Sequence, residues 1–335
     1  MSSSLPRLLI TLGDVAGIGP EIVARAWPHL LPLCRPVVVG DPLWLRRGLE
    51  SIGSARRIVV VSHPAEADAS ADVLPCLTGS DQDLRSVEPG RVCAASGRAA
   101  YDFLCRAIDW TKAGDADGIV TAPLHKEGLH AAGLSYPGHT EILAERTGVK
   151  EFAMVLAVGD LAVAHVTLHM ALREVFRHLT PSAVLEKIRL LDDLQTRLLG
   201  RRPRLGVAAL NPHAGDGGLF GDEEANIIAP AVQAARAQGL DVSGPWPCDT
   251  LFVRARRGDF DGIVAMYHDQ GHIALKLLGA GRAVNISAGL PIVRTSVAHG
   301  TAYDIAGQGI ADAGSLVEAT RVAALLARTQ RRESS

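Results

Sequence analysis

The sequence lacks three features that would each place it in a particular class of protein. It has no apolar run long enough to span a bilayer and no segment of signal-peptide type near its start. Its five cysteines are odd in number and contain no C-x-x-C motif, so free thiols in a reducing cytoplasm are expected. Its net charge of -2 provides no basic patch for nucleic acid or for a membrane surface. We therefore expect a cytoplasmic protein with no nucleic-acid or membrane partner.

The composition is that of a globular protein, with 47% hydrophobic and 21% charged residues, and 335 residues suit two domains. Short apolar segments alternate with segments of helical length. Strands are expected within residues 8–11, 36–41, 58–61, 118–123, 153–157, 162–166, 205–210 and 262–266, and helices over 97–113, 181–199 and 223–238. This alternation predicts an α/β fold with a mostly parallel sheet. No linker divides the chain, so the domains are expected to be interwoven.

A glycine-rich turn follows the first expected strand. Gly13, Gly17 and Gly19 do not have the G-x-G-x-x-G spacing, which leaves a Rossmann dinucleotide site weakly supported. Glycines at these positions can instead let the strand turn tightly into its helix.

Three histidines lie among glycines and carboxylates, each at the end of an apolar, strand-like run: His169, His213 and His268. Loops at strand ends are where α/β proteins build their sites. Three neutral imidazoles can hold a divalent metal and leave one position open for substrate. One such histidine among the 12 in the chain would more simply be structural, but three in such turns favour a metal site.

Two further groups of residues suit an anionic ligand. His139 and Thr140 lie in a polar loop that enters a helix, where amides, a hydroxyl and an imidazole can bind phosphate or carboxylate. Thr140 could equally be an ordinary helix N-cap. Lys276, Asn285 and Arg294 have apolar neighbours, so the two cations should be paired or should bind an anion. For the acids at 222–224 we favour a structural role at a helix start.

The run His299–Gly309 resembles the adenosine-binding loop of isocitrate and isopropylmalate dehydrogenases, which bind NAD(P) without a Rossmann fingerprint. That resemblance assigns cofactor binding to His299, Gly300, Thr301 and Asp304.

Together these motifs resemble the 4-hydroxythreonine-4-phosphate dehydrogenase family over nearly the whole chain. The segments most specific to it are 211–215, 267–271 and 284–296. The resemblance implies an isopropylmalate dehydrogenase-like fold with two α/β domains flanking a cleft. We expect residues 1–125 plus 295–335 to form the first domain, which carries the nucleotide loop. Residues 126–294 would form the second, which carries metal, substrate and dimer contacts.

The resemblance also implies residue roles. One divalent metal per site, zinc or else magnesium or cobalt, would be held by His169, His213 and His268, the last from the partner subunit of a homodimer. Substrate contacts would be His139, Thr140, Lys276, Asn285 and Arg294. Lys276, Asp249 and Asp269 are the candidates for the general base. The implied reaction is oxidation of a phosphorylated four-carbon 3-hydroxy acid by NAD or NADP, followed by loss of CO2.

Two alternatives remain open. The segments 12–16, 122–126 and 270–273 depart from the biosynthetic enzymes and look more like a second branch of the family. That branch resembles catabolic dehydrogenases acting on 4-phospho-D-threonate or 4-phospho-D-erythronate. A metal-dependent lyase could use the same histidines without nicotinamide, although the loop from His299 weighs against it.

Overall fold

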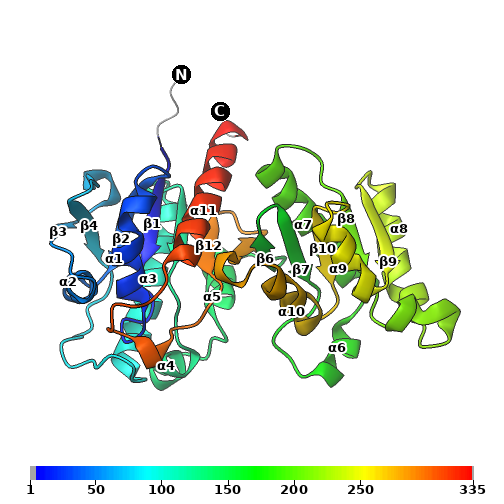
Figure 1. Ribbon diagram of the computed structural model, residues 1–335, viewed down its shortest axis with the longest axis horizontal. Coiled ribbons are helices and arrows are strands. Elements are labelled where there is room, and N and C mark those ends of the chain that lie inside the picture. The colour runs from blue at the N-terminus through cyan, green and yellow to red at the C-terminus, as the bar shows by residue number, and fades with distance from the viewer. Residues whose placement is uncertain (1–4, 334–335) are drawn as a thin grey trace. The chain divides into compact units, whose positions relative to one another are not determined.

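The computed structural model describes residues 5–333, and the chain forms two compact units. Unit 1 contains the described residues up to Lys150 and from Leu290 onward, and unit 2 spans Glu151–Gly289. Figure 1 shows the elements of both units. Residues 126–150 and 290–294 thus belong to unit 1, whereas the expected boundaries placed them in the second domain.

Unit 1 is built on a parallel sheet with the strand order β3-β4-β2-β1-β5-β12. Its strands are β1 (Arg7–Thr11), β2 (Arg35–Gly40), β3 (Arg57–Val61), β4 (Val73–Thr78), β5 (Gly118–Thr121) and β12 (Arg294–Val297). Leu8, Leu9 and Ile10 of β1 are all completely buried. Successive side chains of a strand point to opposite faces, so helices must cover both faces of this sheet.

The helices of unit 1 are α1 (Gly19–Leu30), α2 (Pro42–Ser51), α3 (Ala94–Lys112), α4 (Lys126–Ala131), α5 (His139–Thr147) and α11 (Gly314–Glu333), with the 3-10 turns η1 (Pro64–Glu66) and η5 (Tyr303–Ile305). Pro20 lies in the first turn of α1, where its missing N–H and fixed φ suit a helix start. The turn before it is tight because a Cβ on Gly19 would lie 2.0 Å from the carbonyl oxygen of Leu12. The glycines of this segment therefore serve close packing.

Unit 2 is built on a mixed sheet with the order β11-β6-β7-β10-β8-β9. Its strands are β6 (Ala153–Val158), β7 (Leu161–His165), β8 (Leu205–Ala208), β9 (Val242–Trp246), β10 (Gly262–Ala265) and β11 (Val284–Ala288). The pairs β11–β6 and β6–β7 are antiparallel, and the pairs from β7 to β9 are parallel. The carboxyl ends of β7, β10 and β8 therefore lie at one edge, where the three histidine-bearing loops begin.

The helices of unit 2 are α6 (Leu172–His178), α7 (Pro181–Leu199), α8 (Ala229–Ala237), α9 (Cys248–Arg256) and α10 (His268–Gly279), with the turns η2 (Pro212–Gly218), η3 (Glu224–Ile228) and η4 (Ala280–Arg282). Both α7 and α10 pack on β7 and β10. The segment expected as one helix over 223–238 is a π-helical turn, η3, followed by α8.

The predicted α/β class and mostly parallel pairing are confirmed. In the part of the chain that the structure describes, no helix has both the length and the apolar character needed to cross a membrane.

Candidate active site

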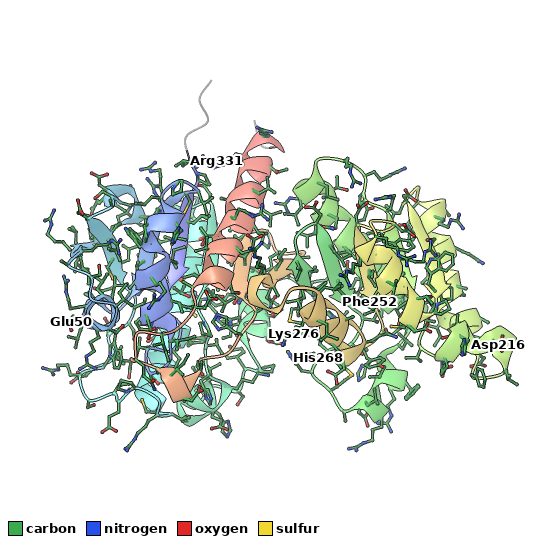
Figure 2. All side chains as sticks on the ribbon, in the orientation of Figure 1. Glu50, Asp216, Phe252, His268, Lys276 and Arg331 are labelled. Atoms are coloured by element: carbon green, nitrogen blue, oxygen red, sulfur yellow. The ribbon has the colours of Figure 1, made fainter. Side chains whose placement is uncertain are left out.

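Two of the three predicted metal ligands, His169 and His268, lie side by side in unit 2. They follow β7 and β10, which are parallel neighbours, so the two loops leave the sheet together. Thr167 ties them, because its Oγ1 donates to the carbonyl oxygen of Met266 over 2.7 Å. The ring centroids of the two histidines are 5.8 Å apart. Figure 2 marks His268 at the start of α10.

Asp269 orients the imidazole of His268. Its Oδ1 lies 2.7 Å from Nδ1 of His268. An ionised carboxylate only accepts hydrogen bonds, so this contact places the ring proton on Nδ1. The lone pair of Nε2 is then available for a metal ion, as in the carboxylate–histidine pairs that surround metals in proteins.

Two more histidines adjoin this pair, and sequence reasoning did not assign His165 any role. His272 stacks on His268 with ring centroids 3.9 Å apart, and its Nδ1 is 3.1 Å from Nε2 of the buried His165. A Cβ on Gly271 would lie 2.4 Å from that Nε2, so only glycine lets α10 approach β7 this closely.

Both rings are held neutral. Burial, with help from the neighbouring imidazoles, lowers the pKa of His165 to about 3. Burial and His268 lower the pKa of His272 to about 4. The signal for His165 was its place at the end of an apolar strand, the same feature that marked His169.

A hollow of about 620 Å³ opens beside His169 and His268 and is lined mainly by residues 168–172 and 267–269. It presents the exposed His169 and the half-buried His268 next to apolar side chains. Such concave sites with a few convergent polar groups are typical ligand sites.

The third predicted ligand, His213, lies in the turn η2, and its side chain is exposed. Among residues 5–333, the structure shows no group of three or more histidine, cysteine, aspartate or glutamate side chains placed to hold a metal ion. One chain thus brings His169 and His268 together and leaves His213 outside that pair. The three-histidine metal site remains a prediction.

The acids after this turn do more than begin a helix. Oε1 of Glu224 accepts from the backbone N–H groups of Leu210 and Asn211, and Nδ2 of Asn211 donates to both Glu223 and Glu224. Gln270 adds a second tie: its Nε2 donates to the carbonyl oxygen of Ala209, and its Oε1 accepts from the N–H of Met266, both over 2.7 Å. These links join the segments that carry His213 and His268. No local sequence pattern predicts these hydrogen bonds.

In unit 1 the structure brings Arg294 and His139 together. Arg294 is only 2% exposed, and its Nη2 donates to Oγ1 of Thr121 over 2.7 Å. Burial lowers its pKa to about 9, so it stays a cation at neutral pH. Burial and this guanidinium hold the pKa of His139 well below its ordinary range. The helix α5 begins at His139, and Thr140 lies in its first turn, so Thr140 is not the N-cap.

Three other predicted residues belong to unit 2. Lys276 is exposed on α10 (Figure 2), and Asp249 is exposed in the first turn of α9. Asn285 is half-buried on β11, and its buried Oδ1 has no hydrogen-bond partner among the described residues. An acceptor left this way is suited to a ligand donor.

The expected nucleotide loop packs on the glycine-rich turn of unit 1. Thr301 is buried, its carbonyl oxygen accepts from the N–H of Ile18 over 3.0 Å, and a Cβ on Gly17 would lie 2.7 Å from the same oxygen. Tyr303 donates to Oδ2 of the buried Asp14 over 2.7 Å. Burial raises the pKa of both side chains. His299, Gly300 and Asp304 are exposed beside this anchor.

Comparison with known proteins finds relatives along the whole chain. A family model described as "Pyridoxal phosphate biosynthetic protein PdxA" matches residues 32–323. The chain is 49% identical to a 4-hydroxythreonine-4-phosphate dehydrogenase of Beijerinckia indica over 92% of its own length and 91% of the relative's. It is 46% identical to a D-threonate 4-phosphate dehydrogenase of Cupriavidus necator, covering 98% and 99%. The crystal structure of a Klebsiella pneumoniae 4-hydroxythreonine-4-phosphate dehydrogenase matches with a TM-score of 0.86 at 44% identity, covering 96% and 99%.

Proposed function

Because the chain belongs to the family of pyridoxal phosphate biosynthetic protein PdxA and is a dehydrogenase, we propose that it oxidises a phosphorylated four-carbon 3-hydroxy acid. NAD or NADP would accept the hydride, and the resulting 3-oxo acid would lose CO2. The observation that carries this proposal is the His169–His268 pair, held at two adjacent strand ends beside a large hollow.

The donor set fits a divalent ion. Imidazole suits zinc and cobalt well, and Asp269 leaves Nε2 of His268 ready to coordinate. His169 and His213 would hold the ion together with a His268 contributed by a second copy of the chain, as the family resemblance implies. When bound, such an ion supplies Lewis acidity, which lowers the pKa of a coordinated hydroxyl group.

The phosphate would bind in unit 1. Arg294 provides a buried cation whose planar fork matches phosphate oxygens, and the first turn of α5 presents backbone N–H groups nearby. A neutral His139 can donate one further hydrogen bond. Fixing the phosphate this way would orient the carbon that loses the hydride. Lys276, Asp249 and Asp269 remain the candidates for the proton acceptor, although Asp269 already uses one oxygen on His268.

Apolar side chains around the site support a homodimer. Ile273 and Leu277 lie one turn apart on α10 and are 57% and 84% exposed, and Leu172 and Phe176 on α6 are 63% and 56% exposed. Large apolar groups gathered around a site commonly mark an interface. A second copy of the chain, related by twofold symmetry, would cover them and share the site.

Two classes of substrate remain candidates. Relatives of nearly equal similarity are named for 4-hydroxythreonine-4-phosphate and for D-threonate 4-phosphate. The segments 12–16, 122–126 and 270–273, which look more like the second branch of the family, favour the sugar acid. The last of them contains His272, which stacks directly on His268.

The test is NAD(P)H formation by zinc- or magnesium-loaded enzyme with 4-phosphohydroxy-L-threonine, 4-phospho-D-threonate and 4-phospho-D-erythronate. Preference for the amino acid would assign the protein to pyridoxal phosphate synthesis. Preference for a sugar acid would make it a catabolic dehydrogenase that yields a triose phosphate and CO2. No NAD(P)H with any of the three would contradict the dehydrogenase reaction proposed here and favour a metal-dependent lyase.

A further inference from the structure

The turn that carries His213 has an unusual backbone. From His213 to Gly217, five consecutive residues have φ between 44° and 79°. Three of them are not glycine: His213, Ala214 and Asp216. L-residues avoid the left-handed conformation, so contacts outside the turn must hold it.

Those contacts converge on one buried carboxylate. Glu224 is 6% exposed, and its Oε1 accepts from the N–H groups of Leu210 and Asn211 over 2.8 and 2.7 Å. Its Oε2 accepts from Nδ2 of Asn211 over 3.0 Å. Burial alone would raise the pKa of Glu224, but these hydrogen bonds together lower it. The carboxylate therefore fixes the two residues through which the chain enters the turn.

The turn also packs closely against this acid. A Cβ on Gly215 would lie 2.9 Å from Oε2 of Glu224. A Cβ on Gly221 would lie 2.6 Å from Oε2 of Glu223 and 2.7 Å from Nδ2 of Asn211. The start of the loop at Asn211, its middle at Gly215 and its end at Gly221 thus all contact the Glu223–Glu224 pair. His213 is exposed, so the backbone of this turn determines where its ring can reach.

We propose that Glu224 is a positioning residue for His213: its buried carboxylate locks the left-handed turn and so aims the imidazole at the divalent ion. This inference rests on the proposed metal-dependent function. Glu224 is not itself a ligand here, because its oxygens already accept three hydrogen bonds.

The substitution Glu224→Gln tests the lock with little change in shape. A glutamine amide would face Nδ2 of Asn211, donor against donor. Asn211 cannot escape by turning its amide over, because its Oδ1 would then face Glu223, acceptor against acceptor. The double variant E223Q/E224Q removes that conflict, since a flipped Asn211 can accept from both glutamines. The single variant should therefore be defective and the double variant partly restored.

The readout is the affinity of the metal-free protein for Zn²⁺ alone, measured by competition with a chelator, together with the visible absorption spectrum after Co²⁺ loading. Loss of an outer partner of a metal ligand typically weakens affinity about 10–100-fold, and we expect that range for Glu224→Gln. Asp222→Asn is the matched control, because Asp222 is a neighbouring acid whose side chain accepts a hydrogen bond from Asn226. It should leave affinity and spectrum unchanged.

The outcomes separate the two proposals. If the unaltered protein binds no Zn²⁺, the metal-dependent function is wrong. If it binds Zn²⁺ and Glu224→Gln binds equally well with the same Co²⁺ spectrum, the positioning role is wrong. Should Glu224→Gln fail to fold, Glu224→Asp replaces it, because a carboxylate that is one methylene shorter keeps its charge but no longer reaches the N–H groups of Leu210 and Asn211. Unchanged affinity in that variant would likewise overturn the proposal.

Discussion

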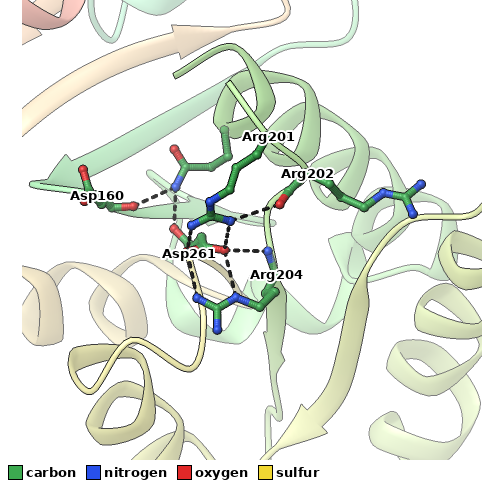
Figure 3. A network of polar contacts seen from close by, with 6 residues as sticks. Asp160, Arg201, Arg202, Arg204 and Asp261 are labelled. Carbon is green, nitrogen blue, oxygen red and sulfur yellow. Dashed lines mark hydrogen bonds and ion pairs between the residues drawn. The ribbon is translucent and has the colours of Figure 1, made fainter. Parts of the chain in front are cut away.

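The two ends of β10 show opposite ways of using polar side chains. At its start, Asp261 is buried and its carboxylate accepts from Arg201, from Arg204 and from the backbone of Arg204, while Gln195 donates to its carbonyl oxygen (Figure 3). Beyond its other end, at Ala265, the chain reaches His268, which lies beside an open hollow.

The two ends differ in how completely their polar atoms are hydrogen-bonded within the protein. Every oxygen of Asp261 is used within the protein. The Arg201 guanidinium, together with Arg204, holds the pKa of this carboxyl well below the ordinary range, although burial alone would raise it. At the carboxyl edge, Nε2 of His268 is left available while the rings behind it are kept neutral. The amino end of the strand therefore contributes to folding stability, and the carboxyl end is prepared for a ligand. Substitutions at the two ends should have separable effects.

The largest effect should come from the ligand end. His169→Ala or His213→Ala should abolish metal binding and turnover, because each removes a donor that no neighbour replaces. Both side chains are exposed, so the free energy of unfolding should change by no more than about 0.5 kcal/mol. Metal content, turnover and urea unfolding measure the three quantities, with the exposed His178→Ala as control. A variant that loses its metal yet keeps full turnover would refute the mechanism.

A mixing experiment tests whether each metal site is formed by one chain or by two. His169 and His268 adjoin in a single chain, whereas the family resemblance assigns His268 to the partner subunit's site. If sites are shared, mixing inactive His169→Ala and His268→Ala proteins should restore partial activity, since a hybrid dimer has one intact site. No recovery, with subunit exchange confirmed by mass spectrometry, would place each site within one chain.

At the amino end of β10, substitutions should lower stability and leave metal binding unchanged. Asp261→Asn should lower the free energy of unfolding by about 2 kcal/mol, because a buried carboxylate loses charge-assisted hydrogen bonds. Zn²⁺ affinity should not change. The control is Asp259→Asn, whose exposed pair with Arg254 should contribute about 0–1 kcal/mol. Equal effects of the two variants would show that burial of Asp261 adds nothing.

The smallest expected effect is the pH dependence of the difference in unfolding free energy between the unaltered protein and Asp261→Asn. The folded pKa of Asp261 is depressed, so its contribution is present above the ordinary aspartate pKa of about 3.9 and is lost as the pH falls through and below it. The stability gap between the unaltered protein and Asp261→Asn should narrow as the pH drops in this range. A gap that stays constant would mean that the carboxylate gains nothing from its arginines.

Much of the fold could be predicted because its signals are local. Apolar runs such as 8–11 and 262–266 become buried strands, and 181–199 becomes a helix with Thr180 as its N-cap. The strand β4 was not predicted from the sequence because it contains Pro75. Proline is tolerated at this position because the pairing of β4 with β2 begins only at Cys76. The strand β9 contains Gly244 and Pro245 and lies at a sheet edge, where such residues are allowed.

The site divides in the same way. His169, His213 and His268 could be identified because each ends an apolar run. The partners that position them could not, because Thr167, Gln270 and Glu224 act on segments that are distant in the chain or reached only after folding. His165 carries the same strand-end signal, but it was passed over because it is the buried last residue of β7 and not part of the loop that follows.

The turn at His213–Gly217 has a consequence for chirality. Its φ angles are the ordinary helical values of D-amino acids with the sign that L-residues avoid. A protein assembled by chemical ligation with D-alanine at position 214 should therefore keep the native backbone and lose the local penalty of about 1–2 kcal/mol that L-alanine bears there. The segment that presents His213 is thus one short stretch of this protein in which the mirror-image building block is the better fit.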